Sequence, residues 1–254
     1  MSLQILSSDQ LQHSPPKINL LVYGMPGVGK TSFAARTEDV LIADVEHGAK
    51  LLGLHGIKAD VATISKWEDM QELYAALQGG KYKTVVIDPI GELLDKLLTS
   101  LKVTHGTKGG EALSLQGWGL AKERFRSMIR AFRDLDVNVV LVAHSSEKKE
   151  EDMLHVRPKL QANLDEDVCA MMDIVGYLKI VTQDKQKIRR LFTQPTDKYY
   201  AKDRSGLLPE FIDDPSFDKM AGIIKDNDWF KIQKAAEKSM DDFEKSLDAV
   251  PLKP

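Results

Sequence analysis

One short segment, Gly24 to Thr31, constrains the fold of this chain more than any other feature. It matches the pattern G-x-x-x-x-G-K-[ST], in which glycines let the backbone curl so that its N–H groups face phosphate oxygens. The apolar run 18–23 precedes it and predicts a buried strand, and a helix is expected to follow. This strand–loop–helix order predicts a phosphate-binding loop, or P-loop.

Each polar group of the loop has an expected partner in a bound nucleotide. Lys30 can reach the β- and γ-phosphates, Thr31 can offer its hydroxyl to Mg²⁺, and the positive end of the following helix favours the same anion. We therefore expect ATP and Mg²⁺ as cofactors. The predicted nucleotide-binding residues are Gly24, Met25, Pro26, Gly27, Val28, Gly29, Lys30, Thr31 and Ser32.

Two acidic residues follow other apolar runs and are candidates for the same site. Asp88 ends the run 84–87, and in a P-loop fold such an aspartate holds the Mg²⁺ shell, although it could instead form a turn before Pro89. Glu46 follows the run 40–44, where a carboxylate could orient and deprotonate the attacking water. Taken alone, Glu46 is better interpreted as a surface acid in a loop.

The alternation of apolar runs with helical patterns predicts an α/β fold with a mostly parallel central sheet. Strands are expected at 18–23, 40–44, 84–87 and 137–143, and helices at 67–77, 92–101 and 118–132, with a loop over 102–117 and a charged loop over 147–152. After residue 145 the pattern changes, and the segments 174–181 and 187–193 predict paired antiparallel strands. We expect a flexible arm over 1–17, an ATPase domain over 18–225 and a polar helical tail over 226–254.

The composition excludes several classes of protein. Hydrophobic residues make up 43% and charged residues 29% of the chain, as in globular proteins that need no disulfides. Cys169 is the single cysteine, the N-terminus lacks a signal-peptide pattern, and no run is long enough to span a membrane. We therefore expect a cytoplasmic protein with no membrane partner. The net charge of −3 means that any DNA-binding face would have to be local.

With these motifs in order, the chain resembles the RecA-like ATPases, particularly the small RecA-like ATP-binding proteins of phages associated with single-strand annealing and recombination. The P-loop, the segment 44–47 with its glutamate and histidine, Asp88, and the segment 201–206 carry this resemblance. It implies a RecA-like core and Glu46 as the catalytic base. If the chain is phage-encoded, its compartment is the host cytoplasm.

The resemblance also implies roles for residues that the pattern alone would leave on the surface. The segment 201–206 is similar to the Lys-Asn-Arg-x-Gly motif of RadA-type and DnaB-type relatives, with Asp203 in place of Asn. Lys202 and Arg204 would then act in trans on the ATP of a neighbouring subunit in a ring or filament. His144, which ends the strand 137–143, would sense the γ-phosphate, unless it is only hydrogen-bonded locally.

In RecA-like relatives two loops face a central DNA, and here they would fall near 102–117 and 145–165. Flexible basic loops can follow phosphates with little sequence preference. For the individual lysines, however, a solvated mixed-charge loop is the favoured interpretation, and acids lie among the lysines of the second loop. The candidate DNA-binding residues are Lys102, Lys108, Lys148, Lys149, Arg157 and Lys159.

The leading hypothesis is an ATPase that acts on single-stranded DNA in recombination or annealing as a homo-oligomer. A single-strand-binding or other replication or recombination protein could be a further partner. The alternatives are a nucleotide-regulated assembly or loader protein and a small-molecule kinase, for which the sequence lacks an arginine-rich lid. A partition-type ATPase is disfavoured because Met25 and Pro26 occupy the place of its signature lysine.

Overall fold

The computed structural model describes residues 17–107, 112–150 and 153–227, and in this part of the chain ten strands form one sheet. Six strands pair in parallel at its centre. In sheet order they are β7 (Ile174–Gln183), β1 (Asn19–Gly24), β5 (Asn138–Glu150), β4 (Thr84–Asp88), β2 (Val40–Asp44) and β3 (Asp60–Thr63). Four further strands are antiparallel to their neighbours: β6 (Met153–Pro158), β8 (Gln186–Phe192), β9 (Lys202–Asp203) and β10 (Phe211–Asp213).

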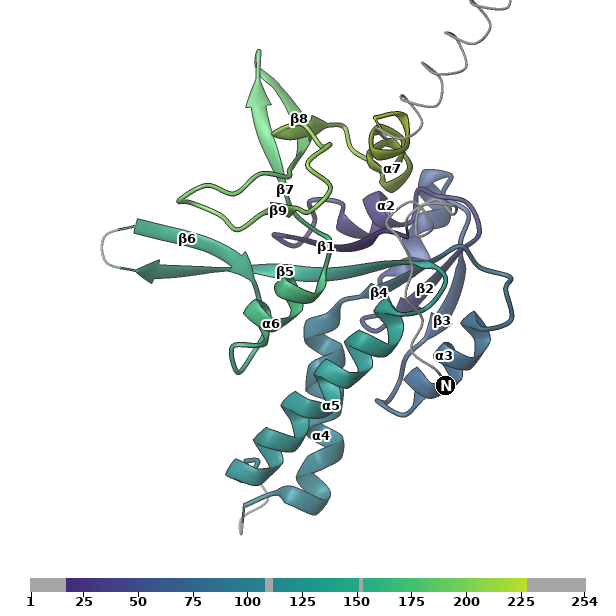
Figure 1. The fold of residues 1–254 in the computed structure, drawn as a ribbon, viewed down its shortest axis with the longest axis vertical. Coiled ribbons are helices and arrows are strands. Elements are labelled where there is room, and N and C mark those ends of the chain that lie inside the picture. Colours follow the sequence, from purple (N-terminus) through teal and green to yellow (C-terminus); the bar gives the residue numbers. More distant parts are fainter. Residues whose placement is uncertain (1–16, 108–111, 151–152, 228–254) are drawn as a thin grey trace, which may run out of the picture.

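Helices cover both faces of the sheet, giving three layers (Figure 1). One hydrophobic cluster joins the sheet to α3 (Asp69–Leu77), α4 (Ile90–His105), α5 (Leu115–Arg133) and α6 (Leu164–Met171). A second cluster, on the other face, joins it to α2 (Lys30–Ala34), the 3-10 helix η1 (Ala49–His55) and α7 (Phe217–Asp226). The predicted α/β fold with a mostly parallel sheet and antiparallel strands in its second half is confirmed. The arm over 1–16 and the tail from residue 228 lie outside the described residues.

Strand β1 shows why the central strands have continuous apolar runs. Leu20 and Val22 belong to one hydrophobic cluster, whereas Leu21 and Tyr23 belong to the other, and all four side chains are fully buried. A strand covered on both faces needs apolar residues at every position. Because its neighbours β5, β4 and β2 run in the same direction, their carboxyl ends meet at one edge of the sheet beside the P-loop.

The two segments predicted as loops are largely regular structure. Strand β5 continues past Ala143 to Glu150 and forms an antiparallel hairpin with β6, so the predicted loop over 145–165 is wrong for this stretch. Charged residues are tolerated there because the hairpin extends from the body of the protein (Figure 1). The predicted loop over 102–117 is also too long, since α4 runs to His105 and α5 begins at Leu115. Ser114 caps α5 by accepting a hydrogen bond from the backbone N–H of Gly117.

One tyrosine ties the β5–β6 hairpin to the P-loop strand. The Tyr23 hydroxyl lies 2.6 Å from the carbonyl oxygen of Tyr200 and 3.1 Å from that of Val156 on β6. Burial of this side chain raises the pKa of its hydroxyl well above the usual value. The hydroxyl therefore stays protonated, and its single proton can be donated to one of the two carbonyls or shared between them.

We expect Tyr23→Phe to lower the free energy of unfolding by about 1–2 kcal/mol, because it leaves buried carbonyl groups with fewer partners. Urea unfolding followed by circular dichroism measures the change. Tyr82→Phe is the matched control, since the Tyr82 hydroxyl bonds Asp60 and Lys81 at the surface. Equal stabilities for Tyr23→Phe and the wild type would show that the buried hydroxyl does not stabilise the contact between β1 and the hairpin.

No helix in the described ranges is long and apolar enough to cross a membrane.

Candidate nucleotide site

The P-loop joins β1 to α2, and its glycines occupy positions where other residues would be strained. Gly27 and Gly29 have φ angles of 79° and 93°, in the left-handed region that L side chains rarely adopt. A Cβ atom on Gly24 would lie 2.2 Å from the carbonyl oxygen of Leu178 on β7. The motif glycines are therefore required by the backbone of the loop and by the close approach of β7.

Lys30 is held over the loop that it follows. Its side-chain Nζ donates hydrogen bonds of 3.0 Å to the carbonyl oxygens of Gly24 and Met25. Only 6% of Lys30 is exposed, and this burial lowers the pKa of its ammonium group, while nearby Asp88 and Glu46 act in the opposite direction. The ammonium group is therefore positioned at the P-loop among carboxylates, as a phosphate-binding lysine should be.

Thr31 and Asp88 come together from different parts of the chain. The Thr31 hydroxyl donates to Asp88 Oδ2 at 2.5 Å. Burial raises the pKa of Asp88, and the hydrogen bond from Thr31 and the charge of Lys30 lower it in part. A hydroxyl beside a carboxylate is the oxygen donor set that Mg²⁺ prefers. These two side chains fit the ion, and they would hold it at the ends of β4 and the P-loop.

Glu46 and His144, which lie far apart in the sequence, are in direct contact. His144 Nε2 lies 3.2 Å from Glu46 Oε1. A carboxylate only accepts hydrogen bonds, so Nε2 carries the proton in this contact, and the buried Nδ1 has no partner among the described residues. Both side chains remain partly exposed at the sheet edge that holds Asp88 and Lys30. The predicted base and the predicted sensor therefore form one pair.

Asp44 holds the turn that carries Glu46, a role that the sequence motifs do not predict. Its carboxylate accepts hydrogen bonds of 3.0 Å from the backbone N–H groups of Gly48 and Ala49, and it is buried. These bonds close the turn that carries Glu46 and start helix η1. An acid at the end of an apolar strand and four residues before a glycine is a recognisable signal for such a turn.

Lys202 and Arg204 lie at the opposite edge of the sheet from the P-loop of their own chain. Strand β9 pairs with the beginning of β7. The backbone N–H of Arg204 donates to the carbonyl oxygen of Asp173, and the backbone N–H of Asp173 donates to the carbonyl oxygen of Asn19 at the start of β1. Six residues of strand, about 20 Å, separate this edge from Gly24. Neither side chain is near its own P-loop, so any contact with ATP has to be with that of another subunit.

The side chains of Lys202 and Arg204 differ in how firmly hydrogen bonds within the chain hold them. Lys202 Nζ donates to the carbonyl oxygens of Cys169, Ala170 and Met172, at 3.2, 3.2 and 2.6 Å, at the end of α6. Its three donors are therefore used within the chain. The Arg204 side chain is 60% exposed, and Asp173 is its ion-pair partner at 3.2 Å. Arg204 Nη2 also donates to the carbonyl oxygen of Ala170 at the end of α6, at 3.5 Å, so Arg204 would lose fewer and longer contacts than Lys202 on reaching a neighbour.

The basic candidates divide between two places. Lys148, Lys149 and Arg157 lie on the β5–β6 hairpin, and Lys159 follows it, with its backbone N–H bonded to the carbonyl of His144. Lys148 lies 3.7 Å from the buried carboxylate of Asp165. Lys102 lies in the last turn of α4, and Lys108 lies outside the described residues. The C-terminal end of α4 and the hairpin extend from the body in different directions (Figure 1), so the structure does not bring Lys102 together with the basic residues of the hairpin.

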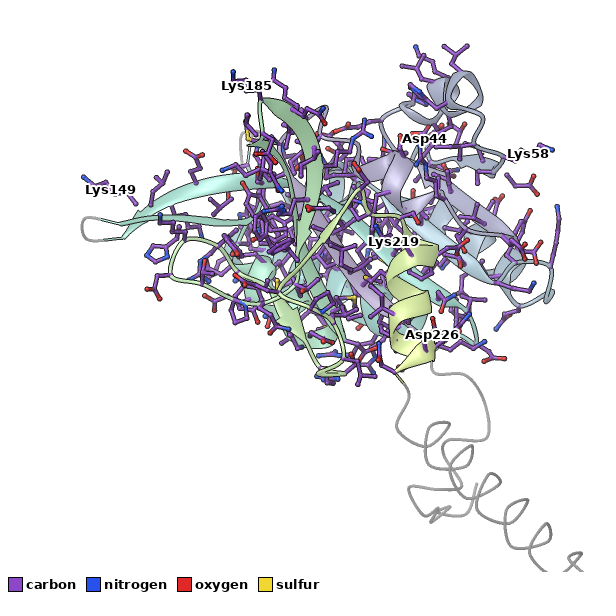
Figure 2. The ribbon with its side chains drawn as sticks, turned by 90° about the horizontal axis from the view of Figure 1, so that it is seen from above. Asp44, Lys58, Lys149, Lys185, Lys219 and Asp226 are labelled. Atoms are coloured by element: carbon purple, nitrogen blue, oxygen red, sulfur yellow. The ribbon has the colours of Figure 1, made fainter. Side chains whose placement is uncertain are left out.

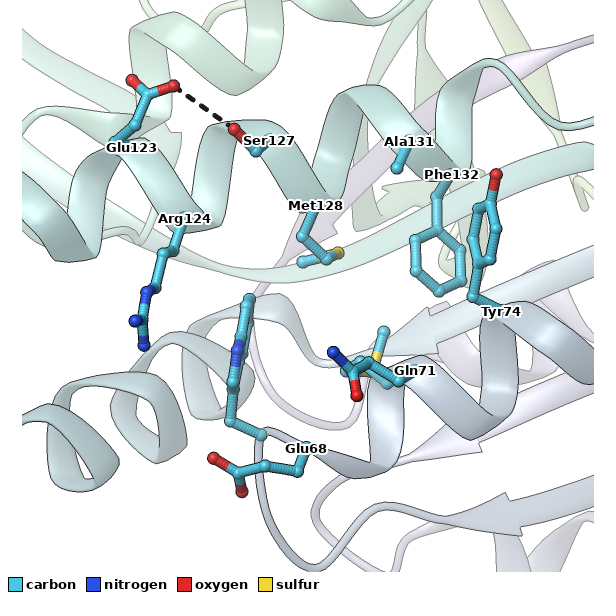
Figure 3. Close-up of a pocket in the computed structure, with 11 residues that line it drawn as sticks. Glu68, Gln71, Tyr74, Glu123, Arg124, Ser127, Met128, Ala131 and Phe132 are labelled. Carbon is cyan, nitrogen blue, oxygen red and sulfur yellow. Dashed lines mark hydrogen bonds between the residues drawn. The ribbon is translucent and has the colours of Figure 1, made fainter.

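A groove of about 630 Å³ lies between α3 and α5 and is separate from the P-loop (Figure 3). Aromatic and apolar side chains line much of it, including Trp67, Tyr74, Met128 and Phe132. The Glu123 carboxylate accepts a hydrogen bond from Ser127 at 3.3 Å at its rim. No P-loop or acidic site residue lines this groove, so it adds nothing to the nucleotide site.

Comparison with known proteins places the site in a family. Residues 16–205 match a family model described as an AAA domain, which covers more than half of the chain. The chain belongs to the AAA domain family. An AAA domain is a P-loop ATPase domain, so the match supports ATP binding and hydrolysis, as the P-loop predicts. The matched range includes the P-loop, Glu46, Asp88 and His144, and it ends just after Arg204.

Similarity to individual proteins is more distant. A KaiC-like protein from the hyperthermophilic archaeon Pyrococcus horikoshii OT3 has a TM-score of 0.43 and 14% sequence identity to this AAA domain protein. The alignment covers 69% of this chain and 77% of that one. The curated proteins include none that matches the chain.

Proposed function

We propose that this AAA domain protein is a Mg²⁺-dependent ATPase that acts on single-stranded DNA in recombination or annealing, with ATP held between subunits. The observation that carries the proposal is the contact between Glu46 and His144. His144 belongs to β5, the strand that continues without interruption into the β5–β6 hairpin, on which Lys148, Lys149 and Arg157 lie among acidic residues. A change at the phosphate site can therefore be transmitted along one strand to a candidate DNA-binding element.

The side chains at the sheet edge can divide the hydrolysis step among them. Glu46 would accept a proton from water as the water oxygen attacks the γ-phosphorus and the bond to the β,γ-bridging oxygen breaks. Lys30 would offset the negative charge that develops on the transferred phosphate. Thr31 and Asp88 would hold Mg²⁺, which supplies further charge neutralisation to the phosphates when bound. His144 keeps the Glu46 carboxylate oriented through the 3.2 Å contact.

Glu46→Gln is expected to lower kcat about 10²- to 10³-fold, because the amide cannot accept the proton from water. ATP binding should be retained, since Glu46 is assigned to the chemical step. Phosphate release and equilibrium nucleotide binding, measured on the same preparation, separate the two effects. Glu68→Gln, on an exposed residue in the turn before α3, is the control. Unchanged kcat in Glu46→Gln would remove Glu46 as the base and favour a nucleotide-regulated loader.

The β5–β6 hairpin is the proposed DNA-binding element, and charge reversal tests it. Lys149→Glu with Lys159→Glu is expected to weaken binding of fluorescent oligo-dT at least about tenfold, because each change replaces a favourable phosphate interaction with repulsion. Lys50→Glu with Lys58→Glu is the matched double variant, because it makes the same charge change on exposed residues elsewhere. Figure 2 shows Lys149 and Lys58 on opposite sides of the molecule. Equal loss in both double variants would show a non-specific charge effect.

The proposed sharing of ATP between subunits assigns Arg204 to the neighbouring site. A mixture of Lys30→Ala and Arg204→Ala protomers should regain activity, because an interface between them can combine an intact P-loop with an intact arginine. Each variant alone should be inactive or nearly so. Full activity of Arg204→Ala alone would rule out the trans arrangement.

A further inference from the structure

Arg189, on β8, lies against the P-loop of its own chain. A Cβ atom built on Gly29 would be 2.9 Å from Arg189 Nε and 3.4 Å from Arg189 Cζ. The guanidinium group is therefore in contact range of the loop at the residue directly before Lys30. No motif of the sequence singles out this arginine.

The strand register explains how Arg189 reaches this position. Tyr23 on β1 pairs with Tyr177 on β7, so Leu178 lies beside Gly24 where β1 ends. Arg189 pairs with Ile180, two residues further along β7 and therefore beyond the end of β1. The β7–β8 hairpin thus extends past the sheet edge at which the P-loop begins.

The direction of the side chain follows from the alternation along β8. Leu191 points into the hydrophobic cluster that contains α2, and Arg189, two residues before it, points to the same face. Arg190 points to the other face, where it binds Asp213 at 2.6 and 2.8 Å and stacks on Phe211. The adjacent arginines therefore have different environments, and that of Arg189 is the P-loop.

The Arg189 guanidinium has no ion pair or hydrogen bond within the described ranges 17–107, 112–150 and 153–227. Arg190, Arg126 and Arg204 all pair with carboxylates. An unpaired guanidinium beside a phosphate-binding loop has the donor geometry and charge that a polyphosphate requires.

We propose that Arg189 binds the phosphates of the nucleotide held by the P-loop of the same chain. This inference rests on the proposed nucleotide site and adds to it a contact in cis, distinct from the trans role proposed for Arg204. Because Arg189 belongs to the β7–β8 hairpin, nucleotide binding would also fix the position of that hairpin over the P-loop.

The test is binding of nucleotide and of tripolyphosphate without hydrolysis, by displacement of a fluorescent ADP analogue. Arg189→Gln is expected to raise the Kd of ADP and of tripolyphosphate about tenfold, as for loss of one charge-assisted contact. Arg189→Lys should recover part of the affinity, because it keeps the charge. Lys187→Ala, which removes an exposed charge two residues away on the same face of β8, should stay within twofold of the wild type.

The possible contrary results are distinguishable. If the wild type binds nucleotide, Lys30→Ala does not, and Arg189→Gln binds like the wild type, the role of Arg189 is overturned while the nucleotide site stands. If Arg189→Gln weakens ADP but not tripolyphosphate, the guanidinium contacts the base or sugar, and the phosphate role is overturned. A wild type that binds no nucleotide overturns both proposals. Arg189 is exposed, so thermal unfolding of Arg189→Gln should match that of the wild type.

Discussion

Lys30→Ala is expected to lower kcat/KM for ATP at least about 10³-fold and to abolish detectable nucleotide binding. The P-loop backbone itself positions the ammonium group, through bonds to the carbonyl oxygens of Gly24 and Met25. Without it, the charge of the β- and γ-phosphates at the loop is not offset by a side chain of this motif. Isothermal titration with ATP and phosphate release measure the two effects.

The control for this variant is Lys50→Ala, which removes the same charge from an exposed position on η1. Its kinetic constants should equal those of the wild type. Circular dichroism should show that Lys30→Ala is folded, since the site lies at the edge of the sheet. A folded Lys30→Ala protein that hydrolyses ATP at the wild-type rate would show that the P-loop is not the catalytic site.

Asp88→Asn is expected to lower Mg²⁺-dependent hydrolysis at least about 10²-fold and, at the same time, to raise the melting temperature. The amide can still accept the hydrogen bond from Thr31, but it is a poor ligand for Mg²⁺. Burial raises the pKa of Asp88, so the ionised carboxylate opposes folding at neutral pH, and the substitution removes this opposition. We expect a rise in Tm of about 2–4 °C, the equivalent of about 1 kcal/mol in a protein of this size.

The pH dependence of that stabilisation gives a second measurement. A carboxyl group whose pKa is raised on folding destabilises the folded state increasingly as pH rises above its unfolded-state pKa. The difference in Tm between Asp88→Asn and the wild type should therefore be present at neutral pH and shrink toward acidic pH. Asp60→Asn, at an exposed site, should show no such rise at neutral pH. An Asp88→Asn variant that is less stable at neutral pH would contradict the buried-charge explanation.

The sequence predicts the centre of this molecule well because its strands are buried on both faces. Strands β1, β2, β4 and β5 all begin within a residue of the predicted positions, and α3 follows the predicted spacing from Met70 to Leu77. Thr31 and Asp88 could be assigned together because the carboxyl ends of parallel strands meet at one edge. The arm, the tail and Lys108 fall outside the described residues, so those predictions stand untested.

The elements that the sequence argument missed are those without a continuous apolar run. Strand β3 is an edge strand with mostly exposed residues, and the part of β5 that enters the hairpin, residues 145–150, contains only polar and charged residues, so neither resembles a buried strand. Arg189 could not be found because only the pairing of β7 with β8 places it over Gly29. Likewise, the three bonds that hold Lys202 at the end of α6 depend on tertiary contacts and carry no local signal.

The most direct test of the account is phosphate release from ATP by the wild-type protein, with and without Mg²⁺ and with and without single-stranded DNA, using Lys30→Ala as the blank. We predict Mg²⁺-dependent hydrolysis that single-stranded DNA increases and that Lys30→Ala lacks under every condition. Hydrolysis at the same rate with and without single-stranded DNA would support the ATPase site and contradict the proposed DNA role. Absence of Mg²⁺-dependent hydrolysis in all conditions would contradict the central claim.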